Sequence, residues 1–124
     1  MSPQTAYSPA AYRQSAVLSA THGQQIVMLY DGAGRFLHQA SVAMGEGKIE
    51  TAHNKLVRAE NIIRHLRQTL VLEQGELAVR LQSIYLFCLR HLSEARFEQD
   101  PKKLSEVRAL LARLRESWAA VERQ

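Results

Sequence analysis

The sequence contains few of the residues that break helices or cross-link chains. Its 124 residues include six glycines, three prolines and one cysteine. Alanine, leucine, arginine, glutamate and glutamine dominate instead, and these residues favour helices. The single cysteine, Cys88, cannot form an internal disulfide, which suits a protein of the reducing cytoplasm. The composition therefore predicts one helical domain, large enough for a hydrophobic core.

Long apolar runs and clusters of one charge are also missing. No run reaches the roughly 18 apolar residues that a membrane-spanning helix needs, and no signal peptide is recognisable. We therefore expect a soluble cytoplasmic protein without stable membrane association. The net charge is +4, which raises the alternative of a small basic nucleic-acid binder. The arginines are scattered between carboxylates and few aromatics accompany them, so solvated helix surfaces explain them better.

The apolar pattern predicts a weakly structured arm followed by four helices. Residues 1–20 hold too few large apolar groups to fold alone and form the arm, and residues 21–124 form the bundle domain. We expect helices over about 21–44 and 48–70, a third after Gly75, and a fourth capped by Asp100 and started by Pro101. Thr21 is the expected cap of the first helix. The fold class is all-α, an antiparallel up-down four-helix bundle with an extended or short-helical N-terminal arm.

A helical period assigns the residues that face the core. On the first two helices they are Ile26, Leu29, Tyr30, Ala33, Leu37, Ala40, Met44, Ala52, Leu56, Ala59, Ile63, Leu66 and Leu70. On the last two they are Leu77, Leu81, Ile84, Cys88, Leu92, Ala95, Leu104, Val107, Leu111, Leu114, Trp118 and Val121.

The stretch at 24–40 also admits a second interpretation. Asp31 and Gly32 form a favoured hairpin turn, so the apolar residues before them could be a strand. A hairpin would leave the following apolar residues without a partner, whereas a helix matches the length of the other three. We therefore expect Gly32 and Gly34 inside a helix, each costing about 1 kcal/mol relative to alanine. That cost suggests that a neighbouring helix or a bound chain approaches the backbone there.

Several apolar residues fall off the predicted core side. They are Val27, Met28, Val42, Val57, Ile62, Val79 and Leu86, with Phe87 and Leu89 at the edges of the third helix's core stripe. Scattered apolar residues are common on protein surfaces. Their grouping on the first three helices nevertheless favours a contiguous groove for a partner.

Catalytic motifs are poorly represented. Glu50 and His53 have the spacing of a di-iron helix motif, but the required second motif is missing, so we expect His53 on the surface. Cys88 lies on the core stripe and is expected to be a buried hydrophobe. No phosphate-binding glycine loop or nucleophile elbow is present. We predict no catalytic residues, no metal site, no cofactor and no enzymatic activity.

Four segments in order resemble the FliS family of flagellar export chaperones. They read AYRQSAV…ATHGQQIVMLYDGA, KLVRAENIIRHL, IYLFCLRHLSEA and LSEVRALLARLRESW. The resemblance covers residues 7–118. Its most specific pieces are Met28 to Ala33, the block from Ala59 to Leu66, and Tyr85 to Ala95. Where many members have Leu-Tyr-Asp-Tyr, this chain has Ile84-Tyr85-Leu86-Phe87, so its outer face is more apolar.

The resemblance implies a bundle that binds the C-terminal segment of flagellin in the cytoplasm. It also implies that the chaperone prevents premature polymerisation and assists delivery to the export gate of the flagellar type III secretion system. The N-terminal arm, with Tyr7 and Tyr12, can occupy part of the client surface in that family. The residues that we expect at the flagellin groove are Val27, Met28, Tyr30, Gly34, Ile62, Val79, Leu86, Phe87 and Leu89.

Overall fold

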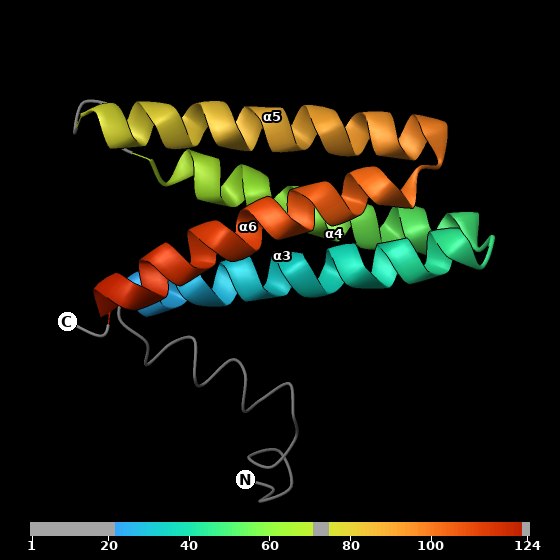
Figure 1. The fold of residues 1–124 in the computed structure, drawn as a ribbon, viewed down its shortest axis with the longest axis horizontal. Helices are drawn as coiled ribbons and strands as arrows, with labels where there is room; N and C mark the ends of the chain where they lie inside the picture. The colour runs from blue at the N-terminus through green and yellow to red at the C-terminus, as the bar shows by residue number, and fades with distance from the viewer. Residues whose placement is uncertain (1–21, 71–74, 123–124) are drawn as a thin grey trace, which may run out of the picture.

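The computed structural model describes residues 22–70 and 75–122, which form four helices and no strand. The helices are α3 (His22–Gly45), α4 (Ile49–Gln68), α5 (Glu76–Glu98) and α6 (Pro101–Glu122). Helices α3 and α5 each pack against both α4 and α6, so the four helices form a closed ring of antiparallel neighbours (Figure 1). The predicted all-α bundle is confirmed. The expected arm at 1–20 and the expected cap at Thr21 lie outside the described residues.

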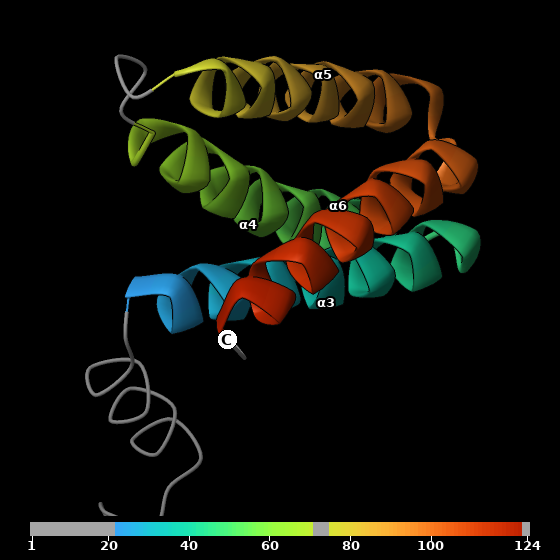
Figure 2. The same ribbon diagram turned by 60° about the vertical axis from the view of Figure 1, so that its left-hand side comes forward.

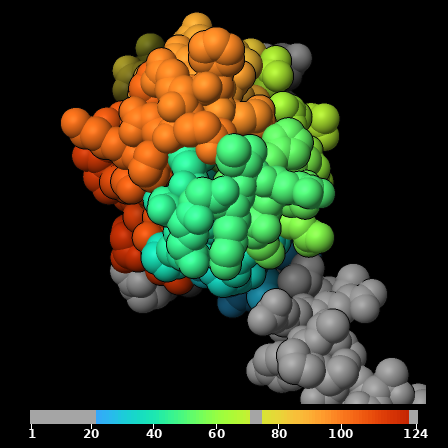
Figure 3. Space-filling model, turned by 90° about the vertical axis from the view of Figure 1, so that its right-hand side faces the viewer, coloured from blue at the N-terminus to red at the C-terminus, as the bar shows by residue number. Residues whose placement is uncertain are grey.

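The helices are not parallel rods. Helix α6 crosses the bundle at an angle, with α3 along one edge and α5 along the other (Figures 1 and 2). Helix α3 contacts α4 and α6 more extensively than α5 does. The end view in Figure 3 shows the start of α4 beside the end of α5, where the two short turns of the bundle lie. The opposite end brings together the start of α3, the end of α4, the start of α5 and the end of α6.

Local backbone geometry explains the two short turns. Gly47 has φ of 74°, and the Lys48 amide donates to the Ala43 carbonyl over 2.8 Å, a glycine-dependent helix ending. Gln99 adopts the same left-handed region without being glycine, with φ of 54°. Asp100 then accepts a hydrogen bond from the Lys102 amide over 3.0 Å. This bond confirms the predicted cap ahead of Pro101.

The core follows the predicted helical period along most of each helix. Its buried side chains include Ile26, Tyr30, Ala33, Leu37, Ala40, Met44, Ala52, Leu56, Ala59, Ile63, Leu66, Leu81, Cys88, Leu92, Ala95, Leu104, Val107 and Leu111. Leu29, Leu70, Ile84, Leu114 and Trp118 are half-buried and pack against this core.

Two core predictions are wrong, and the prediction missed three buried apolar residues, Ala43, Tyr85 and Ala119. Leu77 is 67% exposed and Val121 is 58% exposed, because each lies in a terminal helical turn that neighbouring helices do not cover. Tyr85 is 1% exposed although the period had pointed to Ile84 beside it. Leu81, Cys88 and Leu92 of α5 are buried as predicted, so the error of phase is confined to this one position.

Helix α3 runs without interruption through Asp31, so the hairpin alternative is wrong. Gly32 has a clear packing reason, because a Cβ atom there would lie 3.3 Å from the Ile62 Cδ1 atom of α4. Ile62, which we had placed off the core side, instead packs against the core at this position. A Cβ atom on Gly34 would meet nothing within 4 Å. Packing against α4 therefore explains the glycine at position 32 but not the glycine at position 34.

One buried ion pair joins α4 to α5. Glu60 is 4% exposed and accepts a charge-assisted hydrogen bond from the Arg96 guanidinium. The Nε atom of Arg96 is buried and has no hydrogen-bond partner. The pair therefore connects two helices while leaving one buried donor unsatisfied.

Candidate partner-binding surfaces

The described residues show no constellation that suits catalysis. Cys88 is fully buried, and burial raises the pKa of its thiol to about 11, so it is protonated and inaccessible at neutral pH. His53 is exposed, as predicted. Within 22–70 and 75–122, no three histidine, cysteine or carboxylate side chains are grouped as metal ligands. No helix in these ranges is long and apolar enough to cross a membrane.

The first candidate surface is the exposed apolar side of α5, here called the α5 outer face and defined by Val79, Leu86, Phe87 and Phe97. Val79 is 53% exposed, Leu86 38% and Phe87 43%, and Phe97 is 91% exposed. Val79, Leu86 and Phe97 are spaced by 7 and 11 residues, so they share one helical face. A row of large apolar side chains in water is the usual mark of a partner site.

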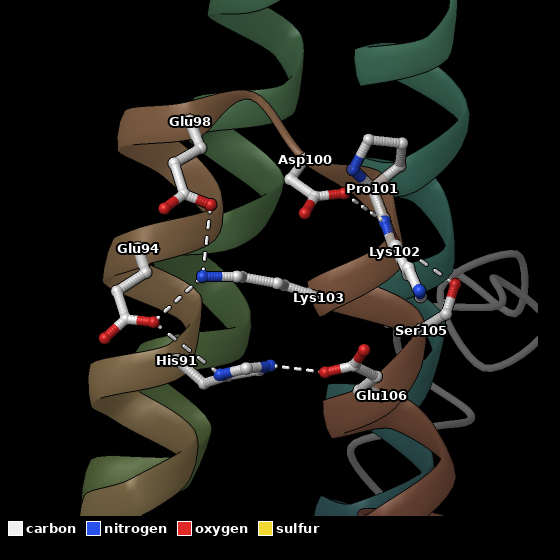
Figure 4. A network of polar contacts seen from close by, with 9 residues as sticks. All are labelled: His91, Glu94, Glu98, Asp100, Pro101, Lys102, Lys103, Ser105 and Glu106. Atoms are coloured by element: carbon white, nitrogen blue, oxygen red, sulfur yellow. Dashed lines mark hydrogen bonds and ion pairs between the residues drawn. The ribbon is translucent and has the colours of Figure 1, made fainter.

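A polar network between α5 and α6 holds one edge of this face in place (Figure 4). His91 donates through Nε2 to the Glu106 carboxylate over 2.6 Å, and the Phe87 ring stacks on the imidazole with centroids 5.1 Å apart. Lys103 donates to the Glu94 carboxylate over 3.0 Å. This bond lowers the pKa of Glu94 and raises that of Lys103. Phe87 is therefore positioned before any partner binds.

The second candidate surface is a cleft of about 350 Å³ where the start of α5 meets three other helix ends. We call it the end cleft. Its lining is mostly apolar and includes Ile26, Leu66, Leu77, Leu81, Tyr85 and Trp118. Leu77 and Trp118 were both predicted as core residues, but their side chains line this cleft and are not fully buried.

Polar groups lie at the inner side of the end cleft. The hydroxyl oxygens of Tyr30 and Tyr85 are 2.5 Å apart, and Tyr85 and Trp118 both line the cleft. Burial is the main cause that raises the pKa of both tyrosines above the ordinary value. The cluster therefore stays neutral, and it satisfies polar atoms that would otherwise be buried alone.

The third candidate surface is a hollow of about 660 Å³ between α3 and α6, here called the α3–α6 groove. Tyr30, Gly34, Leu111 and Ala112 contribute small or apolar surface to its lining. Polar side chains complete it: Asp31, Arg35, His38, Gln39, Arg108, Arg115 and Glu116.

The predicted site residues are distributed over these surfaces. Tyr30 and Gly34 line the α3–α6 groove, although Tyr30 is only 2% exposed. Val79, Leu86 and Phe87 lie on the α5 outer face. The remaining predicted contacts, Val27, Met28, Ile62 and Leu89, are half-buried. Tyr7 and Tyr12 lie outside the described residues.

Sequence reasoning missed some residues on these surfaces. Phe97 was not selected, although its spacing from Leu86 places it on the same face. Arg35 and Arg108 were treated as part of a generally solvated surface, and only the pairing of α3 with α6 brings them to one groove.

This chain is similar in sequence to known flagellar proteins. The family model described as "Flagellar protein FliS" matches residues 4–124. The flagellar secretion chaperone FliS of Salmonella typhimurium is 35% identical over 87% of this chain and 82% of that protein. The FliS of Escherichia coli is 34% identical over 85% of this chain and 79% of its own length. The FliS of Bacillus subtilis is 32% identical, with 87% and 80% covered.

Proposed function

The chain belongs to the FliS family of flagellar secretion chaperones, and from this membership we propose that its client is flagellin. In this proposal the bundle binds the C-terminal segment of flagellin in the cytoplasm. Binding prevents premature polymerisation of flagellin and assists its delivery to the export gate of the flagellar type III apparatus. The role is one of binding, and no catalytic step is involved.

The observation that carries the proposal is the α5 outer face. Leu86 and Phe87 expose large apolar surface to water, and Phe97 exposes almost its entire side chain. A client that folds as it binds typically buries about 1,000 to 3,000 Å². A bundle of this size offers such an area only when the client covers several helices, and the end cleft and the α3–α6 groove supply further concave surface.

Isothermal titration with the isolated C-terminal segment of flagellin tests the proposal. We expect a one-to-one complex with a negative heat-capacity change, because apolar surface is buried. Flagellin truncated of that segment is the matched control and should not bind. A polymerisation assay then checks the consequence, since stoichiometric chaperone should delay filament growth of intact flagellin. Equal binding of intact and truncated flagellin would contradict the proposed client segment.

A further inference from the structure

The α3–α6 groove lies between two polar bridges that join α3 to α6, and small residues stand between those bridges. At one end, Arg115 donates to the Asp31 carboxylate over 2.9 Å. At the other, Arg108 donates to His38 Nδ1 over 3.2 Å. Seven residues separate the two bridges along each helix, about 10 Å at 1.5 Å per residue. Between them stand Gly34 and Ala112, whose small size leaves the space empty.

Gly34 has no packing reason inside the bundle. An alanine methyl group at this position would meet no atom within 4 Å, whereas Gly32 is constrained by Ile62. Glycine in a helix interior costs about 1 kcal/mol relative to alanine. Glycine at position 34 therefore makes the helix less stable than alanine would, at a position that lines an open groove. A bulky side chain of a partner that occupies this open space would account for this choice.

The rim of the groove carries positive charge that the bundle does not neutralise. Arg115 is paired with both Asp31 and Glu116. Over the described ranges, no ion pair joins Arg35 or Arg108 to a carboxylate, and Arg108 hydrogen-bonds the His38 imidazole. A partner with carboxylates beside its contact residue would complement these two guanidinium groups.

We propose that the α3–α6 groove receives one helical turn of the client, with a bulky apolar side chain seated over Gly34 and flanking carboxylates facing Arg35 and Arg108. This inference rests on the proposed function and assigns a subsite for the client. The chain's own arm is a poor occupant on charge grounds. Residues 1–20 contain no aspartate or glutamate and include Arg13.

A graded series at Gly34 tests the steric part with the flagellin C-terminal segment as ligand. Gly34→Ala should melt higher than wild type, by about 3 to 5 °C, because it removes the cost of a helical glycine. It should keep most of the affinity. Gly34→Leu should fold as well but fill the hollow, so its affinity should fall at least about tenfold. Equal affinity of wild type and Gly34→Leu would overturn the subsite.

Charge reversal tests the electrostatic part. Arg108→Glu should weaken binding at least about tenfold at low salt and less at high salt, because the contact is screened. Arg113→Glu is the matched control, since it makes the same charge change at an exposed α6 position outside the groove lining. Replacing client carboxylates by lysine one at a time should identify one that restores binding to Arg108→Glu. Equal losses in both arginine variants, or rescue at no position, would contradict the pairing.

Two further measurements distinguish other occupants. If sedimentation shows a dimer that Gly34→Leu dissociates, a second copy fills the groove and the proposal is wrong. Maleimide labelling of Gly34→Cys reports on the arm, because Cys88 is buried and should stay unlabelled. Faster labelling after deletion of residues 1–20 would show that the arm covers the groove and would also overturn the proposal. We expect client, and not the arm, to slow labelling.

The same titrations separate this inference from the proposed function. Wild-type protein that fails to bind the flagellin segment overturns both. Wild-type binding that survives Gly34→Leu and Arg108→Glu overturns the groove assignment alone and leaves the client in place.

Discussion

The hydroxyl oxygens of Tyr30 and Tyr85 lie 2.5 Å apart and join α3 to α5 through the interior of the bundle. These helices are opposite members of the ring, and both tyrosines are almost fully buried. One hydroxyl donates to the other, so neither is left without a partner in these almost fully buried side chains. The pair therefore sets how the first and third helices meet beside the end cleft.

Removing one hydroxyl of this pair should destabilise the fold by more than half of what removing both hydroxyls does. Tyr85→Phe deprives the Tyr30 hydroxyl of its Tyr85 partner, and we expect a loss of about 1 to 2 kcal/mol in the free energy of unfolding. Tyr30→Phe should cost a similar amount. The double variant should cost clearly less than the two single losses together, because no hydroxyl is left unpaired. Urea unfolding of the four proteins measures this coupling, and strict additivity would contradict it.

Stability should decline at alkaline pH. Burial raises the pKa of Cys88 from the ordinary 9.0 to about 11 and raises the pKa values of Tyr30 and Tyr85. A raised pKa means that the folded state holds the proton more tightly than the unfolded chain does. The stabilisation is complete below the unfolded pKa and is lost as pH rises toward the folded pKa.

For Cys88 this loss should amount to about 2 to 3 kcal/mol, and it should develop between about pH 9 and about pH 11. Urea unfolding across that range measures the decline. Cys88→Ala should show a shallower decline than wild type, because its thiol no longer contributes. Parallel pH profiles for the two proteins would rule out Cys88 as a source of the decline.

The buried ion pair of α4 and α5 should be sensitive to the loss of one partner. Arg96→Met leaves the Glu60 carboxylate buried without its guanidinium, and we expect a loss of about 3 kcal/mol. The double variant with Glu60→Leu should recover part of this loss, because the buried carboxylate that lacks a partner is then removed as well. The exposed pair of Arg80 and Glu76 provides the control, and Arg80→Met should change stability by less than about 0.5 kcal/mol. Similar losses in the two arginine variants would contradict this difference.

Sequence periodicity predicted the fold well where helices are covered along their middle. Ala52, Leu56, Ala59, Ile63 and Leu66 are all buried, since α4 has an asymmetric apolar stripe. Sequence periodicity was less successful where apolar residues surround the helix instead of forming a stripe on one side. The run at 84–89 is apolar on all sides, so its phase could not be chosen.

The candidate surfaces were less predictable because they depend on pairs of helices. A helical wheel describes one helix and cannot foresee that His38 meets Arg108, or that Gly34 lies between two polar bridges. It also assumes that neighbours cover every turn, and this assumption failed at Leu77. Periodicity thus predicts which side of a helix is buried, whereas grooves require the register between helices.

The N-terminal arm should compete with the client. This prediction rests on the sequence alone, where Tyr7 and Tyr12 stand on a segment with few other large apolar residues. Deleting residues 1–20 should expose apolar surface, raise the fluorescence of a bound hydrophobic dye and leave client affinity equal or higher. A chain with both tyrosines replaced by serine is the control of unchanged length and should behave similarly. A clear loss of client affinity would instead indicate that the arm contributes contacts.

The α5 outer face should be required for binding and dispensable for folding. Leu86 is 38% exposed, whereas Leu81 on the same helix is 5% exposed. Leu86→Asp should therefore change stability by no more than about 1 kcal/mol, as ordinary surface substitutions do, while Leu81→Asp should unfold the bundle. Leu86→Asp should still weaken client binding strongly, because the new carboxylate would be desolvated against an apolar partner.

Thermal melts and calorimetric titration distinguish the possible results for Leu86→Asp. Ser117→Asp is the control, since it adds the same charge to an exposed position on α6. A melt as early as that of Leu81→Asp would mean that Leu86 supports the core and that the face is not free for a partner. A normal melt with normal binding would mean that the client does not use this face. The proposed contacts would then have to come from the end cleft and the α3–α6 groove, where filling the space over Gly34 gives an independent test.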